Sequence, residues 1–270
     1  MYEEMMELSG ENPGPTSIVL AGVHGNERCG VEALGRMLPS LKIQKGRVLF
    51  GYGSPRAIMR NVRLTESDLN AMFKPDDMLP PEKRRSYEYA RAQFLKPYLD
   101  QADVLLDIHA SNTPGSPSFA ICESNASDIV RFLPVSIVAS GFDQVQPGGT
   151  DYYMNQKGKI GICIECGYVG DPASTEVAQR SITAFLVSRG HIGGELQTYA
   201  QSSIRMSFMY ITRTGFLPAN PFKDFESVAA GQLIGVDGRE EVRAQEGGII
   251  LFSRNRKGPN EEAFLLGKYL

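Results

Sequence analysis

Two residues early in the chain, His24 and Glu27, have the types and spacing of a metal-binding pair. They lie three residues apart, directly after an apolar run, and a second histidine, His109, follows another apolar run at 104–108. Two imidazoles and a carboxylate form a mixed nitrogen and oxygen set that suits Zn²⁺ and leaves a fourth position open for water, as in catalytic zinc sites. The sequence therefore predicts one catalytic zinc ion, with His24, Glu27 and His109 as its ligands.

A lone histidine is more often a surface or hydrogen-bonded core residue than a metal ligand, and His-x-x-Glu also occurs by chance. The chain has three histidines, however, and His24 and His109 stand where an apolar run ends. That is the place where open α/β sheets put their sites. The third, His191, lies in Arg-Gly-His-Ile-Gly-Gly, which is typical of a helix end or a linker, and we assign it no chemistry.

Glu165, at the end of a third apolar run at 161–165, is the candidate general base. Zinc lowers the pKa of a bound water to about 7, and a carboxylate must still take and return the proton. A glutamate in an apolar run needs a partner or a function, although an ordinary ion pair at a strand end is the alternative. Asp107 lies two residues before His109 on the same strand face. It could orient that ligand or pair with an arginine, and both interpretations stay open.

Amide hydrolysis also needs positive charge where the carbonyl oxygen becomes an oxyanion. Arg63 is the candidate, because the segment 60–70 around it is too rich in polar residues for a plain linker. The alternative for Arg63 is an ordinary solvated loop arginine. Asn70, in the same segment, could hydrogen-bond a carboxylate or an amide of the substrate.

Strands and helices must position these residues. Apolar runs predict strands at 17–23, 47–52, 104–108, 119–122, 136–139 and 161–165, and helical spacing predicts helices at 27–38, 81–99 and 175–189. The stretch 56–81 is rich in charge, Asn, Asp and Pro, so we expect a long functional loop there. Strands that alternate with helices imply an α/β fold, with a mainly parallel or mixed sheet flanked by helices on both faces.

The pattern changes after Gly194, where apolar residues alternate with polar ones and turn residues recur at short intervals. This predicts a small all-β module. With the boundary near 194–202, the expected domains are a catalytic domain at 1–198 and a β domain at 199–270.

Composition excludes several classes of protein. The 270 residues, 42% of them hydrophobic, suffice for one α/β domain and a smaller module. A net charge of −3 without a basic stripe argues against a nucleic-acid partner. No stretch approaches the roughly 20 apolar residues of a membrane span, and the acidic N-terminal segment is unlike a signal peptide. We therefore expect a cytoplasmic protein that binds no membrane, and we leave a homo-oligomer open.

The four cysteines include one Cys-x-x-Cys, formed by Cys163 and Cys166, a spacing that could indicate a redox or zinc-ribbon motif. This segment is predicted to be a strand, in which residues three apart point to opposite faces. Buried reduced thiols are therefore the better interpretation.

Taken in order, these motifs resemble the succinylglutamate desuccinylase and aspartoacylase family, a branch of the zinc carboxypeptidase-like enzymes. The motifs are Gly-x-His-Gly-Asn-Glu at 22–27, Arg63 with Asp-Leu-Asn at 68–70, Asp-x-His at 107–109 and Glu-x-Gly at 165–167. The resemblance covers most of the chain. It implies a carboxypeptidase-like α/β domain followed by a smaller β domain that shapes or covers the site.

The resemblance also implies a role for each matching residue. The zinc ligands would be His24, Glu27 and His109, the general base and later acid Glu165, the carbonyl polariser Arg63, and a substrate contact Asn70. These roles agree with the assignments made from the residues alone.

The chain departs from the family pattern at two places. Ala71 stands where the family typically has an arginine that holds the substrate's carboxylate by a bidentate pair. The segment 150–157 lacks the second substrate-binding arginine of aspartoacylase, and Lys157 or Lys159 would supply a point charge there instead. We expect hydrolysis of a small N-acyl amino acid or related compound. The alternatives are a carboxypeptidase-like peptidase, or a metal-binding regulatory or ligand-binding protein without the family's activity.

Overall fold

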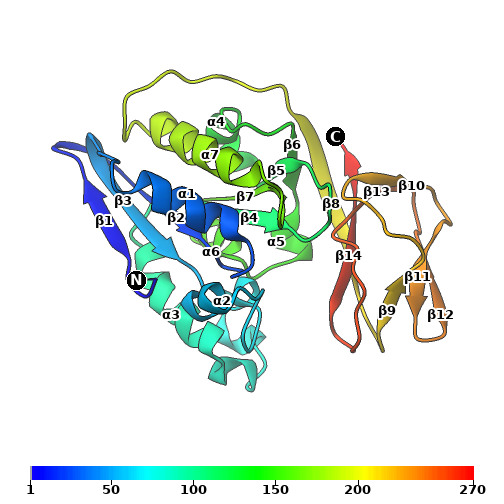
Figure 1. The fold of residues 1–270 in the computed structure, drawn as a ribbon. Coiled ribbons are helices and arrows are strands. Elements are labelled where there is room, and N and C mark those ends of the chain that lie inside the picture. Colours follow the sequence, from blue (N-terminus) through cyan, green and yellow to red (C-terminus); the bar gives the residue numbers. More distant parts are fainter. Residues whose placement is uncertain (1) are drawn as a thin grey trace.

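A large mixed β-sheet runs through the protein, and a computed structural model describes it for residues 2–270 (Figure 1). Its strands, in spatial order, are β1 (Met6–Ser9), β3 (Lys45–Tyr52), β2 (Asn12–Ala21), β4 (Val104–Ser111), β7 (Ile160–Tyr168), β5 (Ser118–Cys122), β6 (Ile137–Ser140), β8 (Ser202–Ile211), β14 (Glu262–Tyr269), β13 (Gly248–Leu251) and β10 (Glu226–Val228). A separate antiparallel sheet contains β12 (Glu240–Arg243), β11 (Leu233–Asp237) and β9 (Phe216–Pro218).

The centre of the large sheet is parallel: β3, β2, β4 and β7 run in the same direction. All eight residues of β4 are buried, as expected of a strand that is covered on both faces. The next strand, β5, is antiparallel to β7, which makes the sheet mixed. The predicted α/β class is therefore confirmed.

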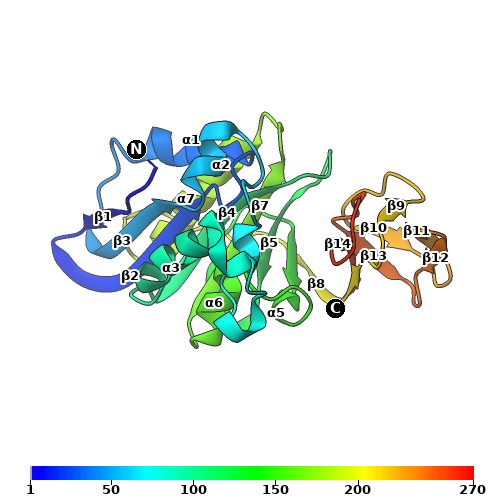
Figure 2. The same ribbon diagram turned by 90° about the horizontal axis from the view of Figure 1, so that it is seen from below.

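Helices cover both faces of this sheet (Figures 1 and 2). They are α1 (Arg28–Met37), α2 (Pro55–Arg60), α3 (Tyr87–Leu99), α4 (Ser127–Val130), α5 (Phe142–Val145), α6 (Thr150–Gln156) and α7 (Ser174–Ser188). Helices α1 and α7 pack on one face, where Leu34 and Phe185 share a core with Ile108. On the other face, Leu95 of α3 and Met154 of α6 share a second core. None of the described helices is long and apolar enough to cross a membrane.

Several segments differ from the sequence-based expectation, among them β1, α4 and α5, which were not predicted. The helix predicted at 81–99 begins only at Tyr87, because the Ser86 hydroxyl accepts a hydrogen bond from Tyr89 N and caps the helix there. The expected loop at 56–81 is partly helical, since it contains most of α2 and the short 3₁₀ helices η1 (Leu69–Ala71) and η2 (Asp76–Met78). Two more 3₁₀ turns are η3 (Lys83–Arg85) and η4 (Ser124–Ala126). The segment at 150–157, with no predicted element, forms α6.

The C-terminal strands continue the large sheet and also build the second one. Strand β8 pairs with β6 at its start and with β14 along its length, so the large sheet extends across the boundary predicted near 198. The three-stranded sheet lies beyond it, on the far side of β13 and β14 (Figure 1). The all-β character of this region is as expected, and the division at 198 stays a prediction.

Asp237, on β11, stabilises the turn that follows β8 by accepting hydrogen bonds from it. Its buried carboxylate accepts hydrogen bonds from the backbone N–H groups of Arg213, Thr214 and Gly215 and from the hydroxyls of Thr214 and Tyr210. Although burial alone would raise the pKa of Asp237, these bonds hold it well below its usual value.

We expect Asp237→Ala to lower the free energy of unfolding by about 2–4 kcal/mol, because several buried donors lose their acceptor at once. Urea unfolding followed by circular dichroism measures the difference. Glu240→Ala is the matched control, since Glu240 is exposed and pairs with the exposed Arg213; it should change the free energy of unfolding by less than about 0.5 kcal/mol. Equal stability of Asp237→Ala and the wild type would contradict the assignment.

Candidate metal and active site

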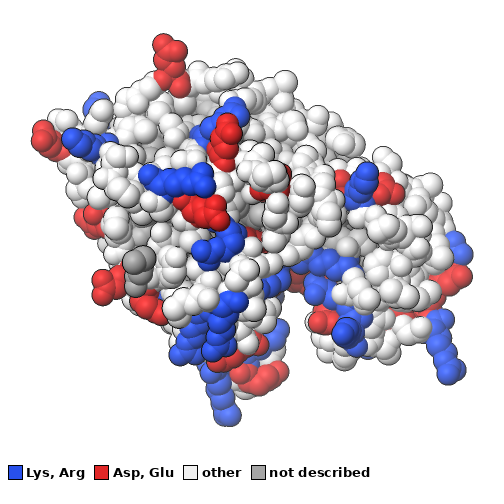
Figure 3. All heavy atoms as spheres, in the orientation of Figure 1, with Lys and Arg blue, Asp and Glu red and all other residues white. Residues whose placement is uncertain are grey.

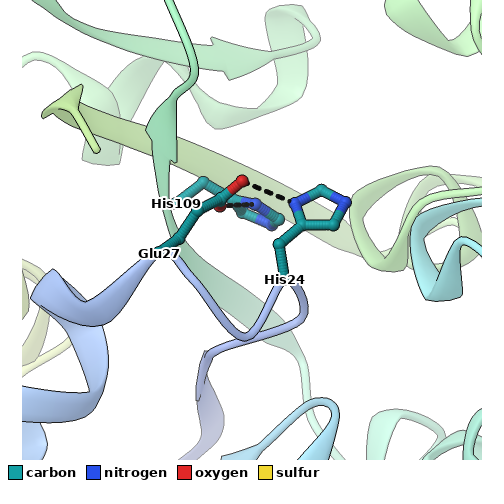
Figure 4. Close-up of side chains that lie close together, drawn as sticks. All are labelled: His24, Glu27 and His109. Carbon is teal, nitrogen blue, oxygen red and sulfur yellow. Dashed lines mark hydrogen bonds and ion pairs between the residues drawn. The ribbon is translucent and has the colours of Figure 1, made fainter. Parts of the chain in front are cut away.

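The loop that leaves β2 carries His24 and Glu27 into the interior. Gly22 turns the chain with a φ of +66°, a conformation that favours glycine. At Gly25, an added Cβ would lie 2.0 Å from the Ala57 carbonyl carbon, so only glycine lets the loop approach α2 this closely. Glu27 occupies the N-cap position of α1, yet its side chain makes no capping bond and turns toward the histidines (Figure 4).

His109 reaches the same point from β4. The pairing of β2 with β4 ends at Ala21 and Ile108, so His109 lies beside the loop that leaves β2. The Glu27 oxygens lie 2.8 Å from His24 Nδ1 and 2.9 Å from His109 Nδ1 (Figure 4). One atom from each of the three side chains falls within 4.8 Å of the others. The structure thus brings together the three residues that the sequence predicts as ligands.

Each imidazole turns its other nitrogen toward a second carboxylate. His24 Nε2 lies 3.1 Å from Asp68 Oδ1, and His109 Nε2 lies 3.3 Å from Asp107 Oδ2. Asp107 is itself held by the Thr150 hydroxyl, which donates a hydrogen bond of 2.5 Å. Carboxylates behind ligand histidines fix the ring orientation and raise the basicity of the nitrogen that faces the metal. This arrangement favours the orienting role of Asp107 over an arginine pair.

The three side chains fit a zinc ion by their chemistry. His24 Nδ1 is buried and, apart from the 2.8 Å contact with the fellow ligand Glu27, has no partner within residues 2–270. Burial alone would raise the pKa of Glu27, but His24 and His109 hold it well below its usual value, so that this carboxylate stays ionised. A second group, formed by His109, Cys163 and Glu165, is also close enough to share an ion. The first set is preferred because it contains both predicted histidine ligands, whereas burial raises the pKa of the Cys163 thiol and so opposes formation of a thiolate in the second.

Glu165 lies beside His109 in the ladder between β4 and β7. It is buried, and its Oε2 has no hydrogen-bond partner in the described part of the chain. Burial, together with the nearby charge of Glu27, raises the pKa of Glu165 to about 7. A carboxylate with such a pKa can take up a proton and release it near neutrality.

Arg63 and Asn70 line the same cavity as the histidines and Glu165. Arg63 Nη1 donates a hydrogen bond of 2.9 Å to Glu27 Oε1, and Nη2 lies 3.6 Å from Asp68 Oδ2. Asn70 follows Asp68 closely, and its backbone N–H donates to Asp68 Oδ1. The loop at 60–70 therefore supplies both residues that the sequence predicts there.

Lys157 lies outside this group. Its side chain is half-exposed at the end of α6, with Nζ 3.8 Å from Asp100 Oδ1, and it does not line the cavity. Lys159 is also turned away, since its Nζ donates to the backbone oxygens of Leu99 and Asp100. The helical form of 150–156, which was not predicted, orients both lysines away from the site.

The cavity is lined instead by residues from β14 and from the loop between β13 and β14. Phe252, Arg254, Arg256, Glu262 and Phe264 line it together with the predicted site residues. Figure 3 shows lysine and arginine atoms gathered at the hollow between the α/β part and the C-terminal strands. The sequence analysis missed these residues, because they are far along the chain from the motifs at 22–167 and no sequence pattern indicates that the two regions lie close together in the fold.

The remaining histidine and the cysteines have structural roles. His191 is buried, and its ring nitrogens lie 2.8 Å from Ser17 Oγ and 2.9 Å from the Lys45 carbonyl oxygen, so it is a hydrogen-bonded core residue rather than a linker residue. All four cysteines are buried and free, which confirms the interpretation of Cys163 and Cys166 as reduced thiols.

A model of the succinylglutamate desuccinylase/aspartoacylase catalytic domain matches residues 13–189 of this chain. The chain belongs to this family. The match includes every site residue predicted for this chain and ends before its C-terminal strands. The resemblance seen in the motifs is therefore confirmed.

Individual relatives of this family member are distant. A succinylglutamate desuccinylase from Shewanella putrefaciens is 24% identical over 264 residues, which cover 87% of the chain and 76% of the relative. Among solved structures, succinylglutamate desuccinylase from Vibrio cholerae has a TM-score of 0.81 at 21% identity, covering 98% and 85% of the two chains. The ectoine utilization protein EutE (DoeB) from Ruegeria pomeroyi, with bound product, has a TM-score of 0.74 at 17% identity, covering 98% and 88%. These structures share the fold across differently named proteins, so the substrate must be inferred from the site.

Proposed function

We propose that the protein is a zinc-dependent hydrolase that cleaves the amide bond of a small N-acyl amino acid or a related compound. The observation that carries this proposal is the convergence of His24, Glu27 and His109 with Glu165 and Arg63 in one cavity. Membership of a family of deacylases supports the reaction type.

The ion would be held by His24, Glu27 and His109. When bound, Zn²⁺ supplies a polarised water of lowered pKa and a Lewis acid for the carbonyl group. Glu165 takes the proton from the attacking water as its oxygen bonds to the carbonyl carbon. Arg63 stabilises the negative charge that develops on the carbonyl oxygen. Glu165 then passes the proton to the amide nitrogen as the C–N bond breaks, which releases an amine and a carboxylic acid.

The shape of the site supports a small substrate over a polypeptide. The cavity is bounded on one side by the C-terminal residues Phe252, Arg254 and Phe264 and on the other by the loop of Arg63 and Asn70. A ligand-binding protein without turnover would have no need for a buried Glu165 whose Oε2 lacks a hydrogen-bond partner within residues 2–270 and whose pKa is raised to about 7. The hydrolase is therefore preferred over both alternatives.

Metal analysis tests the proposal directly. Protein purified without chelators should contain about one zinc ion per chain, and His109→Gln should lose most of it. His191→Gln is the matched control, because His191 lies in the core away from the cavity and this variant should keep its zinc. Absence of zinc in the wild type, with no uptake of added Zn²⁺, would refute the proposal.

The zinc-loaded protein should also hydrolyse members of a panel of N-acetyl and N-succinyl amino acids, followed by release of the free amine. Turnover of dipeptides alone would favour the peptidase. Full zinc content without turnover of any compound would favour the ligand-binding protein.

A further inference from the structure

Arg254 lines the cavity and forms no direct ion pair within residues 2–270. Of the other arginines that line the cavity, Arg63 pairs with Glu27, and Arg256 Nε donates to the Glu262 backbone oxygen. Within residues 2–270, Arg254 has neither an ion pair nor a side-chain hydrogen bond to Nε, although this nitrogen is buried. Its Nε is therefore a buried donor that still needs an acceptor.

Leaving such a donor without an acceptor is costly, more so when the group is charged. Burial and the neighbouring charge of Arg63 lower the pKa of Arg254 to about 10, so the side chain remains a cation near neutrality. An unsatisfied buried polar group in a native structure calls for an explanation, and a functional role at a binding or catalytic site is one of them. A negatively charged group in the cavity would relieve both the missing hydrogen bond and the repulsion from Arg63.

The loop that carries Arg254 is fixed by its own hydrogen bonds. Arg254 N donates to the Ala263 carbonyl oxygen over 2.9 Å, and Arg256 forms a two-way bridge with the backbone of Phe216. At its start, Phe252 N donates to the Asp224 carboxylate over 2.9 Å. The backbone that carries the side chain is thus fixed before any ligand arrives, which reduces the entropy lost on binding.

Asp224 also connects this loop to the strand of the proposed metal ligand. Its buried carboxylate accepts hydrogen bonds from the hydroxyls of Ser111, at 2.6 Å, and Thr113, at 3.0 Å. Ser111 is the last residue of β4, two positions after His109. The loop backbone at Arg254 therefore has a fixed position relative to His109, as expected of a residue that orients a substrate at the metal.

The geometry points to Arg254 as the residue that binds a carboxylate of the substrate, supplied by the C-terminal strands rather than by the α/β part. This inference rests on the proposed function, which identifies the substrate as an N-acyl compound. The planar guanidinium matches the two oxygens of a carboxylate. Ionisable carboxyl groups of Asp68, Asp151 and Glu262 also line the cavity, which disfavours a more highly charged anion such as phosphate.

Calorimetry with ligands that cannot be hydrolysed tests this role without relying on turnover. Dicarboxylates from succinate to adipate would be titrated into the zinc-loaded protein, each compared with the monocarboxylate of equal chain length. One carboxylate can occupy the metal in both compounds, so the ratio of their Kd values reports on the second carboxylate. We expect the wild type to prefer at least one dicarboxylate by about tenfold or more, as for a hydrogen bond between charged groups.

Arg254→Gln should abolish this preference while leaving monocarboxylate binding and zinc content unchanged. Arg254→Lys should recover part of it, because the charge is kept and the planar fork is lost. Arg213→Gln, an exposed arginine in the same region, is the matched control and should behave as the wild type. Thermal melting of each variant verifies that the fold is intact.

Three results would overturn the inference: no dicarboxylate preference in the wild type, an unchanged preference in Arg254→Gln, or an equal loss of both ligand types in that variant. The outcome is separable from that of the proposed function. An Arg254-dependent preference in a protein that hydrolyses no N-acyl compound would refute the hydrolase and retain the carboxylate site. If the protein hydrolyses N-acyl acids and Arg254→Gln leaves this activity unchanged, the hydrolase is retained and the carboxylate site is refuted.

Discussion

Glu165→Gln is expected to keep the zinc content of the wild type and to lower kcat by about 10²- to 10⁴-fold, the usual contribution of a general base. The amide has nearly the shape of the carboxylate, so the buried site should stay intact. It cannot accept the proton of the attacking water, however. Zinc measured by mass spectrometry, together with turnover of the best N-acyl substrate, gives both quantities on one preparation.

Two further variants make the Glu165 result specific. Glu165→Asp keeps the carboxylate on a side chain that is shorter by one methylene, and it should retain intermediate activity. Glu176→Gln, on the exposed side of α7, should leave both zinc and turnover unchanged. If Glu165→Gln lost its zinc, the ion would lie in the group of His109, Cys163 and Glu165 instead, and Glu165 would be a ligand. Undiminished turnover would reject the role of base.

The sequence predicted the parts of the site that depend on strands. His24, Glu27, His109 and Glu165 all lie at or just beyond the ends of apolar runs, and parallel strands bring such ends to one edge of the sheet. Their convergence follows from topology, which hydrophobic patterning reveals. The helices were predicted less well at their ends, as the cap at Ser86 shows, because one side-chain hydrogen bond decides where a helix begins.

The parts that the sequence did not predict depend on contacts between distant segments. Arg254 enters the cavity from a loop that Asp224 fixes to the end of β4, and no periodicity connects these residues. Lys157 was placed at the site for its charge alone, but α6 turns it toward Asp100. The direction of a long side chain depends on the element that carries it. The charge of a residue therefore does not predict whether its side chain points into the site.

Glu88 is a residue that positions Arg63 and Asp68 through the backbone between them. Glu88 is fully buried at the start of α3. Its carboxylate accepts hydrogen bonds from Thr65 N at 3.0 Å, Thr65 Oγ1 at 2.5 Å, Glu66 N at 3.3 Å and Ser67 N at 3.0 Å. These donors lie between Arg63 and Asp68, so one side chain fixes the backbone that presents both to the cavity.

Glu88→Ala is therefore expected to impair stability and catalysis together. Three backbone N–H groups and a hydroxyl lose their buried acceptor, which should lower the free energy of unfolding by about 2–4 kcal/mol. A displacement of Arg63 by about 1 Å should lower kcat/KM by about 10²-fold. Glu82→Ala, an exposed glutamate just before α3, is the control for both measurements. Assays well below the melting temperature separate the two effects: if the variant is fully folded there and kcat/KM equals that of the wild type, Glu88 stabilises the loop without positioning Arg63.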